Sequence, residues 1–342
     1  MENSAILRVG LIGAGSHVRR SHVPHLLRNG CKVVAVYDPS KKSRRKLFEI
    51  TGEVPVCESA DKLARREDVD LVIIGTPDEY HLEHLTAVVK ARKPVMCEKP
   101  LIVTVEDLEE LSELFSFAQA EGIPIFSCHP RRDRHNPNLG YGWVRERVIE
   151  LISLLGSLQY IRLDSSYPIP SNGWKEDRRF LPDKFVHDVD WFRDLLGDQP
   201  LLAYDLTDEE HIFHRYDVAG KIGKVTFSCI GTRLHEGEDN YTESILLRFA
   251  AGTVTVYVKT GMIHYHMHEN QEEWWDSTSL LPMDETGYNR VFDGLAADLV
   301  TEVRRGRPDA AGLVDLWVNS AVVGSLVDEG VFRYAGSSAV PF

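Results

Sequence analysis

Residues 6 to 128 alternate short apolar runs with longer segments of helical periodicity. The apolar runs are rich in β-branched residues, and they read ILRVGLI, KVVAVYD, DLVIIG, PVMC and IPIFS. Strands that alternate with helices usually pair in parallel, because each crossover is long enough to hold a helix that covers one face of the sheet. The alternation therefore predicts an α/β fold for residues 1–128, with a parallel sheet of the Rossmann type.

The pattern changes after residue 128, at the stretch CHPRRDRHNP. A helical pattern follows over residues 141–155, and then come short runs that read LQYIRL, KVTFSCI, SILLRFA and TVTVYVK. Turn residues between such runs favour antiparallel pairing. We therefore expect a second, α+β domain over residues 129–342 with a largely antiparallel sheet, and helices near 185–196, 291–305 and 313–327 that cover one face of it.

Length and charge exclude several classes of protein. The 342 residues suggest about two domains. A net charge of −13 repels phosphates, so we expect neither nucleic acid nor an anionic membrane as a partner. Five widely spaced cysteines without a C-x-x-C pair, and an N-terminus without a basic and apolar leader pattern, favour a reducing cytoplasm.

The first apolar run leads directly into the glycine turn Gly13-Ala14-Gly15-Ser16-His17-Val18. In a G-x-G-x-x-G turn the first glycine permits a sharp bend and the second lets a pyrophosphate approach the backbone. The third position is normally Gly or Ala, for close packing of the helix on the strand, and here it is Val18. The N–H groups at the helix start then bind the phosphates. The pattern predicts a dinucleotide-binding turn of Gly13, Gly15, Ser16 and His17, with a glycine-rich β-turn without a ligand as the alternative.

An acidic residue ends the second apolar run. Asp38 lies 23 residues after Gly15, where a carboxylate accepts hydrogen bonds from the adenosine ribose. Because a carboxylate repels a 2′-phosphate, Asp38 favours NAD over NADP. NADP is the alternative, since a run of hydroxyl and basic residues follows: Ser40, Lys41, Lys42, Arg44 and Arg45.

Three further segments resemble a known family. The blocks Thr76-Pro77 with His81, and Glu98-Lys99-Pro100, are similar to the T-P-x-x-x-H and E-K-P blocks of the glucose-fructose oxidoreductase and inositol dehydrogenase (Gfo/Idh/MocA) family, and residues 22–26 resemble its H-x-P-x-L segment. The resemblance implies a nicotinamide cofactor bound by Thr76, Pro77, His81, Glu98 and Lys99. It also implies that Glu98 lies near the nicotinamide ribose, that Lys99 reaches the reacting carbon, and that the Lys99–Pro100 bond is cis.

In the second domain, Asp183 and His187 resemble the family's D-x-x-x-H catalytic pair. Four residues apart on a predicted helix, they share a face, so the carboxylate can orient the imidazole. Oxidation of a secondary alcohol needs a base for the hydroxyl proton while hydride moves to nicotinamide C4. We expect His187 to be that base and Lys99 to be a cationic donor or a proton carrier. The alternative is an ordinary exposed lysine and an i,i+4 surface pair.

The chain departs from the family's pattern before Asp183. The family usually has a Gly-Gly-Gly loop between a tryptophan and the D-x-x-x-H pair, whereas Trp174 is followed by KEDRRFLPD, which contains no glycine. The family's pocket shape therefore does not carry over directly. Tyr167 and Trp174 lie in this region and are candidates for lining the substrate pocket.

Two arginines and a tract of histidines are further candidate ligand sites. Arg131 and Arg132 follow the last strand of the first domain, where open α/β sheets bind ligands, so they are candidates for holding an anionic group of the substrate. A salt bridge at the domain hinge is an equal alternative. His264, His266 and His268 would lie about 7 Å apart along a strand, which is awkward for one zinc ion. We predict no metal ion.

These observations predict an NAD(P)-dependent oxidoreductase. It would transfer a hydride between nicotinamide and a secondary alcohol or ketone of a sugar, cyclitol or related polyol, at a site between the two domains. The resemblance implies a homodimer or homotetramer formed through the second sheet. The alternatives are an NAD-dependent glycoside-cleaving enzyme on the same fold and a dinucleotide-sensing protein without turnover, and Lys99 and His187 argue against the latter.

Overall fold

The computed structural model describes residues 6–168, 180–210, 214–234, 241–306, 310–336, 338 and 340–341. Its chain divides into two compact units. The first unit comprises Met1–Pro130, Asn289–Ser320 and Pro341–Phe342, and the second comprises Arg131–Tyr288 and Ala321–Val340. None of the described helices is both long and apolar enough to cross a membrane.

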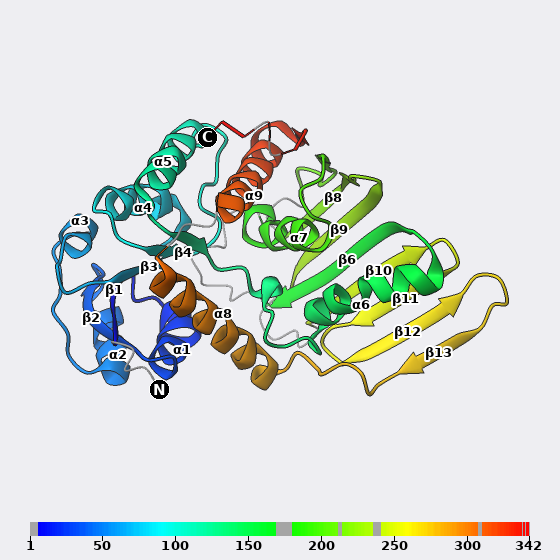
Figure 1. Ribbon diagram of the computed structural model, residues 1–342, viewed down its shortest axis with the longest axis horizontal. Helices are drawn as coiled ribbons and strands as arrows, with labels where there is room; N and C mark the ends of the chain where they lie inside the picture. Colours follow the sequence, from blue (N-terminus) through cyan, green and yellow to red (C-terminus); the bar gives the residue numbers. More distant parts are fainter. Residues whose placement is uncertain are drawn as a thin grey trace. The chain divides into compact units, whose positions relative to one another are not determined.

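The first unit is built on a five-stranded parallel sheet, as the alternating pattern predicted (Figure 1). Its strands are β1 (Leu7–Ile12), β2 (Cys31–Tyr37), β3 (Leu71–Ile74), β4 (Val95–Cys97) and β5 (Ile125–Ser127), in the order β2-β1-β3-β4-β5. A single parallel bridge joins Val56 to Val36 on β2. If that bridge is counted as a shortened strand, the order matches that of a classical dinucleotide-binding sheet, with its switch point between β1 and β3.

Helices connect these strands. They are η1 (Val18–His22), α1 (Val23–Arg28), α2 (Lys41–Thr51), α3 (Ala60–Ala64), η2 (Asp78–Tyr80), α4 (His81–Lys90) and α5 (Leu108–Glu121). The serines before α2 and α3 cap them, because the Ser40 hydroxyl accepts from the Ser43 N–H and the Ser59 hydroxyl accepts from the Lys62 N–H. Gly122 ends α5 in the left-handed conformation, which favours glycine. The Thr104 hydroxyl bonds to the Asp107 side chain, and the helix starts only at Leu108.

Two helices in the last sixty residues of the chain pack differently from what we expected. The helix α8 (Glu285–Arg305) buries Phe292, Ala296, Leu299 and Val300 in the core of the first unit, together with residues of β1 and β2. The helix α9 (Ala310–Glu329) buries Leu313 and Leu316 in the core on the other side of the same sheet. Residues 289–320 therefore belong to the first unit, whereas we expected them to cover the second sheet within a domain over 129–342.

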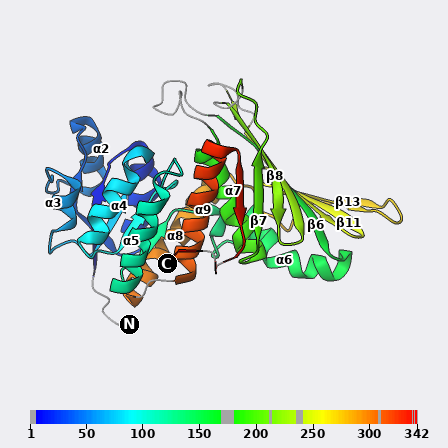
Figure 2. The ribbon, with the colours of Figure 1, turned by 90° about the horizontal axis from the view of Figure 1, so that it is seen from above.

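The second unit contains a nine-stranded sheet in the order β13-β12-β11-β10-β6-β9-β8-β7-β14. All of its pairs are antiparallel except β6 with β9, which confirms the expected α+β class. The strands are β6 (Leu158–Pro168), β7 (Leu201–Asp205), β8 (Arg215–Ile222), β9 (Val225–Leu234), β10 (Thr242–Phe249), β11 (Gly252–Tyr257), β12 (Met262–Met267), β13 (Glu273–Asp276) and β14 (Val331–Tyr334). The helices α6 (Gly140–Leu155) and α7 (Leu181–Leu196) lie along one face of it (Figure 2).

A close backbone contact joins the ends of β1 and β3 in the first unit. A Cβ atom on Gly13 would lie 2.7 Å from the carbonyl oxygen of Gly75, and a Cβ atom on Gly75 would lie 2.2 Å from Cγ2 of Val18. Val18 stands where a G-x-G-x-x-G turn normally has glycine or alanine. The glycine that permits helix and strand to pack closely is therefore Gly75, on the opposite side of the contact.

We expect Gly75→Ala to lower the free energy of unfolding by about 1–3 kcal/mol, because the added methyl group overlaps a buried side chain. In a Val18→Ala background the same change should cost less than about 0.5 kcal/mol, since only the Val18 Cβ, 3.7 Å away, remains near it. Chemical denaturation of the four proteins of this cycle measures both values. Equal costs in the two backgrounds would show that Val18 and Gly75 are not coupled.

Candidate active site

The carboxyl ends of four parallel strands bring the predicted cofactor residues to one edge of the first sheet. Ile12 pairs with Tyr37 and with Ile74, and Ile74 pairs with Cys97. The residues that follow these strand ends therefore lie at the same edge, and they are Gly13, Asp38, Gly75 and Glu98. Open α/β sheets bind ligands at this edge, beside the switch point.

Asp38 is fixed by the backbone of the glycine turn. Its Oδ2 accepts a hydrogen bond of 2.7 Å from the Ala14 N–H, and its Oδ1 accepts one of 2.7 Å from the Ser40 N–H. Each carboxylate oxygen can accept more than one hydrogen bond. The side chain is thus oriented by the protein and keeps acceptor capacity for the hydroxyls of a ribose.

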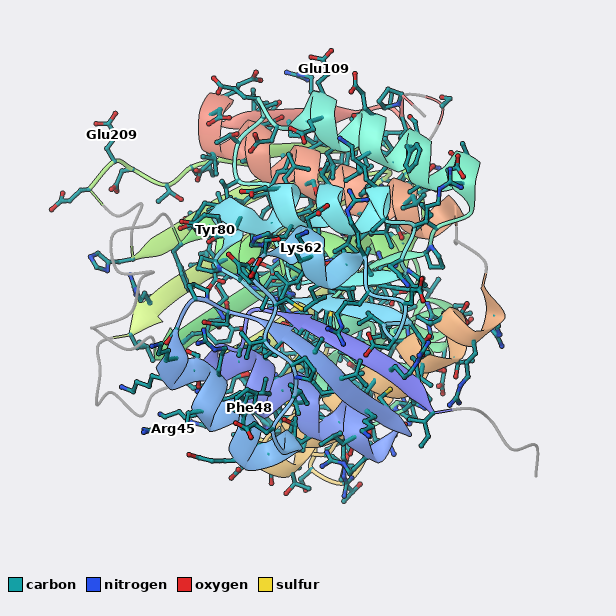
Figure 3. All side chains as sticks on the ribbon, turned by 90° about the vertical axis from the view of Figure 1, so that its left-hand side faces the viewer. Arg45, Phe48, Lys62, Tyr80, Glu109 and Glu209 are labelled. Carbon is teal, nitrogen blue, oxygen red and sulfur yellow. The ribbon has the colours of Figure 1, made fainter. Side chains whose placement is uncertain are left out.

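The basic run after Asp38 forms part of α2. The Ser40 hydroxyl caps this helix, and the Arg44 guanidinium donates to the backbone carbonyl of Asp38. Arg45 is exposed and points away from the sheet (Figure 3). Most of this run is therefore a solvated helix face, and Arg44 is the member that lies beside Asp38.

The two turn glycines differ in what surrounds them. Gly13 has φ +91° and no room for a side chain, whereas a Cβ on Gly15 would find only the Gly75 carbonyl oxygen, 3.9 Å away. Open space beside Gly15 is what a pyrophosphate needs in order to approach the backbone. Arg19, which the sequence analysis did not single out, donates from its guanidinium to the Ala14 carbonyl and so lies over the turn.

The Thr76-Pro77 block is tied to the Glu98-Lys99-Pro100 block by one imidazole. The two ring nitrogens of buried His81 lie 2.9 Å from the Thr76 carbonyl oxygen and 2.6 Å from the Pro100 carbonyl oxygen. His81 therefore holds the two loops together from within the unit. The Thr76 hydroxyl lies 3.2 Å from Nδ1 of His84, a second histidine of α4.

Glu98 is the most buried charged group at this edge. Its Oε1 lies 3.1 Å from Nε2 of His17 and 2.5 Å from Nε2 of His22. Burial by itself raises the pKa of Glu98, but the two histidines outweigh it and hold this pKa well below its usual range. Burial lowers the pKa of His22, although the carboxylate opposes that shift, so a neutral His22 can donate to Glu98. Glu98 and His17 were predicted at this edge from the sequence, whereas the contact of His22 with Glu98 was not.

Lys99 follows Glu98 directly, with its side chain half-buried. The Lys99–Pro100 peptide bond is cis, as the family resemblance implied. The Lys99 N–H donates to Oε2 of Glu98 over 3.3 Å. The buried thiol of Cys128 lies beside the same carboxylate, and burial followed by the charge of Glu98 raises the pKa of that thiol well above its usual range.

In the second unit, α7 carries both predicted catalytic residues. Asp183 lies in its first turn and His187 one turn later, so they share a helix face as predicted. Lys184 Nζ lies 3.9 Å from Oδ2 of Asp183 and 4.3 Å from the centre of the Tyr167 ring. The structure thus brings Tyr167 to the start of α7. Trp174 lies outside the described residues.

Arg131 is the centre of a buried polar cluster in the second unit, which we call the Arg131 network. Its guanidinium pairs with Asp188 of α7, and its Nη2 lies 2.8 Å from Oε1 of Glu243. Four tyrosine hydroxyls donate to these two carboxylates: Tyr216 to Asp188, and Tyr141, Tyr167 and Tyr241 to Glu243. Arg131 is the first residue of the second unit, and both of its terminal nitrogens have acidic partners within that unit, as the salt-bridge alternative predicted.

The two carboxylates of the Arg131 network differ in how far their partners offset the effect of burial on the pKa. Burial raises the pKa of Asp188, and Arg131 and Tyr216 offset this only in part. For Glu243 burial is also the largest effect, but Arg131 and the tyrosine hydroxyls outweigh it and lower the pKa. Arg132 pairs in turn with Asp190 of α7 over 2.7 Å. Both arginines thus form salt bridges with acidic residues of α7. The spacing of these residues in the sequence did not predict the salt bridges.

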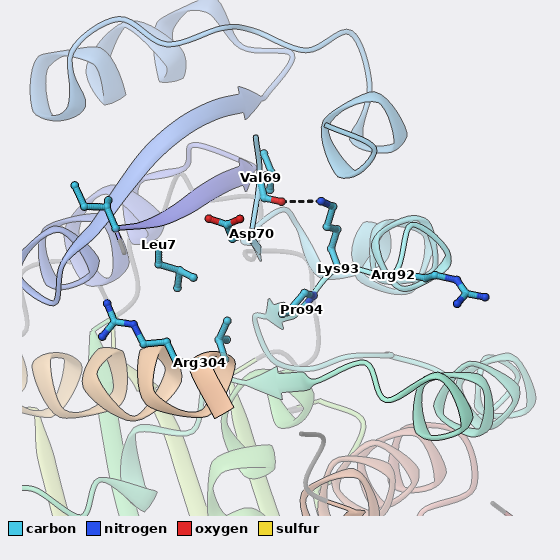
Figure 4. Close-up of a pocket in the computed structure, with 9 residues that line it drawn as sticks. Leu7, Val69, Asp70, Arg92, Lys93, Pro94 and Arg304 are labelled. Atoms are coloured by element: carbon cyan, nitrogen blue, oxygen red, sulfur yellow. Dashed lines mark hydrogen bonds between the residues drawn. The ribbon is translucent and has the colours of Figure 1, made fainter. Parts of the chain in front are cut away.

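A cavity in the first unit lies at the opposite edge of the sheet (Figure 4). Its lining includes Leu7 and Pro94 at strand starts, Arg304 of α8, and Lys93, whose Nζ donates to the Val69 carbonyl over 2.8 Å. These are the amino ends of β1, β3 and β4. Because dinucleotides bind at the carboxyl ends, this cavity is distinct from the predicted cofactor site.

The histidine tract on β12 does not converge. His264 stacks on Trp275 at 4.4 Å between ring centres, while His266 and His268 meet edge to face at 5.7 Å. Among the residues that the structure describes, three potential metal ligands gather instead at His17, His22 and Glu98.

Comparisons with known proteins agree with this geometry. Residues 7–121 match the GFO_IDH_MocA family model, described as an oxidoreductase family with an NAD-binding Rossmann fold. The chain is 27% identical over 227 residues to 1,5-anhydro-D-fructose reductase of Ensifer adhaerens, covering 64% of this chain and 66% of the relative. It is 41% identical over 105 residues to inositol 2-dehydrogenase 1 of Mycolicibacterium vanbaalenii, covering 30% and 29%. The matches thus span less than two thirds of these relatives.

Solved structures share the fold over nearly the whole chain. A levoglucosan dehydrogenase in complex with NADH and levoglucosan has a TM-score of 0.75 at 17% identity, covering 98% of this chain and 100% of that one. The 3-ketoreductase KijD10 from Actinomadura kijaniata, in complex with TDP-benzene and NADP, has a TM-score of 0.75 at 19% identity, covering 95% and 98%. The first unit thus matches the NAD-binding Rossmann model of the Gfo/Idh/MocA oxidoreductase family over residues 7–121, and these solved structures share the fold of nearly the whole chain.

Proposed function

We propose that the protein is an NAD-dependent oxidoreductase that transfers a hydride between nicotinamide and a carbon bearing a hydroxyl group in a sugar, cyclitol or related polyol. The observation that carries this proposal is the edge of the first sheet, where the glycine turn, Asp38 and the Glu98-Lys99 pair follow neighbouring strands. The names of the relatives, which include inositol dehydrogenases and a sugar reductase, support the substrate class.

The glycine turn suits the pyrophosphate of the cofactor. The backbone is open beside Gly15, and the first N–H groups of the helix that follows, from Ser16 onward, have no acceptor within a helix. Arg19 lies over the same turn through its bond to the Ala14 carbonyl and adds a positive charge. We assign the pyrophosphate to Gly13, Gly15, Ser16 and His17, with Thr76, Pro77 and Glu98 toward the nicotinamide and His81 fixing their loops.

The chemical step needs a proton acceptor and a group that stabilises the alcohol oxygen. When bound, the cofactor supplies nicotinamide C4 as the hydride acceptor. We assign His187 as the base and Asp183 as the residue that orients it, one helical turn away on α7. The Lys99 ammonium donates to the substrate oxygen. We assign Arg131 and Arg132 to the positioning of α7, since both already pair with its acidic residues, and keep Tyr167 as a pocket residue beside Lys184.

Assembly and location are parts of the same proposal. The chain has five cysteines, and all are free thiols, which suits a reducing cytoplasm. Large aromatic side chains are exposed on the outer strands of the second sheet, where Trp274 is 45% and Trp275 is 56% exposed. Both lie on the edge strand β13, and aromatic side chains are enriched at protein interfaces. We propose a homo-oligomer formed through this sheet.

The direct test of the function is a panel of sugars, cyclitols and glycosides incubated with the protein and NAD. We expect reduced nicotinamide with at least one polyol and no release of the aglycone from glycosides. Glycoside release without net cofactor reduction would instead establish the glycoside-cleaving alternative. Cofactor binding without either reaction would favour a sensing role.

Replacing Gly15 by valine should raise the Kd for NAD at least about tenfold, because the side chain fills the open space that the pyrophosphate needs. Isothermal titration calorimetry measures this affinity. Gly15→Ala tests the fold separately, since its Cβ meets no atom closer than 3.9 Å and the unfolding free energy should stay within about 0.5 kcal/mol of wild type. An unchanged Kd in Gly15→Val would place the pyrophosphate elsewhere.

Wild-type protein should bind NAD more tightly than NADP, and Asp38→Ser should reverse or equalise this preference. The change removes both the repulsion of a 2′-phosphate and charged hydrogen bonds to the ribose, which are worth about 1.5–3 kcal/mol, or roughly 10- to 100-fold in Kd. Asp38→Asn is the matched control, because it removes the charge but keeps an oxygen for the Ala14 N–H. Tighter binding of NADP by the wild type would overturn the cofactor assignment.

Lys99→Met and His187→Asn should each lower kcat about 10²- to 10⁴-fold while leaving the Kd for NAD within a few-fold of wild type. Asp183→Asn should do less damage, because Asp183 only orients the imidazole. Lys62→Met, on the exposed face of α3 (Figure 3), and His214→Asn, at an exposed position, are the matched controls. Turnover near the wild-type rate in Lys99→Met or His187→Asn would remove that residue from the mechanism.

A further inference from the structure

His17, His22 and Glu98 place three potential metal ligands together in the first unit. The Nε2 atoms of both histidines face the same carboxylate oxygen, at 3.1 Å for His17 and 2.5 Å for His22. All three ligand atoms lie within 4.8 Å of one another. The two histidines come from the glycine turn and its helix, and the glutamate comes from the end of β4. The three side chains form a compact set of potential ligands.

A local helix distortion brings the two histidines together. Residues Val18–His22 form a π-helical turn. In an α-helix, residues five apart point roughly 140° away from each other at about 100° per residue, whereas the wider π-turn, with its i→i+5 hydrogen bond, rotates less per residue and brings them nearer to one face. The two imidazole rings meet edge to face at 5.2 Å between centres. Such π-turns within α-helices frequently mark functional sites.

The neighbouring side chains hold the rings in place. The Phe292 ring of α8 packs edge-on against His17 at 5.9 Å and against His22 at 5.7 Å. Nδ1 of His17 lies 3.2 Å from the Ser21 hydroxyl. Histidines that bind metals commonly use one ring nitrogen as the ligand while the other makes an orienting hydrogen bond of this kind. His17 is thus oriented to present Nε2 toward Glu98.

We propose that His17, His22 and Glu98 bind one divalent transition-metal ion of the Zn²⁺ or Co²⁺ type. Two imidazoles and a carboxylate are a donor set that suits these ions, whereas Mg²⁺ and Ca²⁺ prefer oxygen ligands alone. Tetrahedral coordination with bonds of about 2.0–2.1 Å separates neighbouring ligand atoms by roughly 3.3–3.4 Å. The His17–Glu98 separation is already close to this value, and the His22–Glu98 separation must widen by less than about 1 Å.

One of the three side chains is exposed and two are buried, so an ion could reach the site from solvent. The His17 side chain is 46% exposed, while those of His22 and Glu98 are 6% and 9% exposed. An ion can therefore enter past His17 and bind to the two buried ligands. Three protein ligands leave a fourth position for water. This site is separate from the histidine tract on β12, and it revises our expectation that the chain binds no metal.

The metal and the cofactor should exclude each other, and this part of the inference rests on the proposed function. We assign His17 to the pyrophosphate turn and Glu98 to the nicotinamide ribose. A metal ion would occupy both side chains and place its water ligand in the same space. Zn²⁺ would therefore act as an inhibitor that competes with NAD.

The test uses cofactor-free, chelator-treated protein titrated with Co²⁺, whose visible absorption reports tetrahedral coordination, and with Zn²⁺ in a calorimeter. We expect one ion per chain and a loss of at least about tenfold in affinity in His17→Ala, whose side chain is largely exposed. His266→Ala, in the tract on β12, is the matched control and should bind as the wild type does. The proposal would be overturned if Co²⁺ gave no tetrahedral spectrum, or if His17→Ala bound the metal ion with the wild-type affinity. Loss of affinity in His266→Ala alone would also overturn it.

Competition is measured by titrating NAD into the Co²⁺-loaded protein. We expect the Co²⁺ absorption to fall as NAD binds, and the apparent Kd for NAD to rise with the Co²⁺ concentration. NAD affinity is measured first on metal-free protein, and failure to bind there would contradict the proposed function rather than the metal site. Binding of NAD to the metal-free protein together with an unaffected Co²⁺ spectrum would contradict the shared site.

Discussion

The contact of the Gly75 backbone with Gly13 and Val18 sets the geometry of the whole candidate cofactor site. Since neither glycine leaves room for a Cβ atom, β1 and β3 approach each other closely at their carboxyl ends. This approach fixes where the glycine turn ends and where the helix with His17 and His22 starts. It also sets the position of the next strand, β4, and thus of Glu98 at its end. A side chain at either glycine would displace several site residues at once.

The first domain was largely predictable from the sequence because its signals are local. The five parallel strands, the turn at Gly13 and the carboxylate of Asp38 each follow from periodicity or short spacing. In the second unit, the helical pair of Asp183 and His187 was predictable for the same reason. The cis bond before Pro100 followed only from the family resemblance. In contrast, β7, β8, β13 and β14 were not predicted, because short strands in a mixed sheet carry weak periodic signals.

The remaining differences arise from contacts between distant parts of the chain. Nothing in the pattern of α8 shows which sheet its apolar face covers, and Phe292 packs in the first unit instead of the second. The partners of Arg131 lie 57 and 112 residues away, so spacing could not show that its charge is already compensated. His22 was visible only as part of a family segment, because its alignment with His17 depends on a π-turn that sequence patterns do not reveal.

Buried charged groups in both units fix the side chains that we assign to the hydride transfer. At the edge of the first sheet, Glu98 is kept anionic by its histidines, beside the lysine that we assign to the substrate oxygen. In the second unit the Arg131 network holds α7, which carries the assigned base, by its buried acidic residues. The side chains that we propose as catalytic thus stand on elements that are fixed by buried polar contacts, which is the preorganisation that such a reaction needs.

The most direct measurement of the central claim is the fate of the carbon-bound hydrogen. The protein is incubated with NAD and with sugars and cyclitols that carry deuterium on each hydroxyl-bearing carbon, and the nicotinamide cofactor is analysed by mass spectrometry. We predict reduced cofactor that contains one deuterium atom, transferred directly from the polyol. Reduced cofactor without deuterium, or no reduction by any member of the panel although NAD binds, would contradict the assignment of the protein as a polyol oxidoreductase.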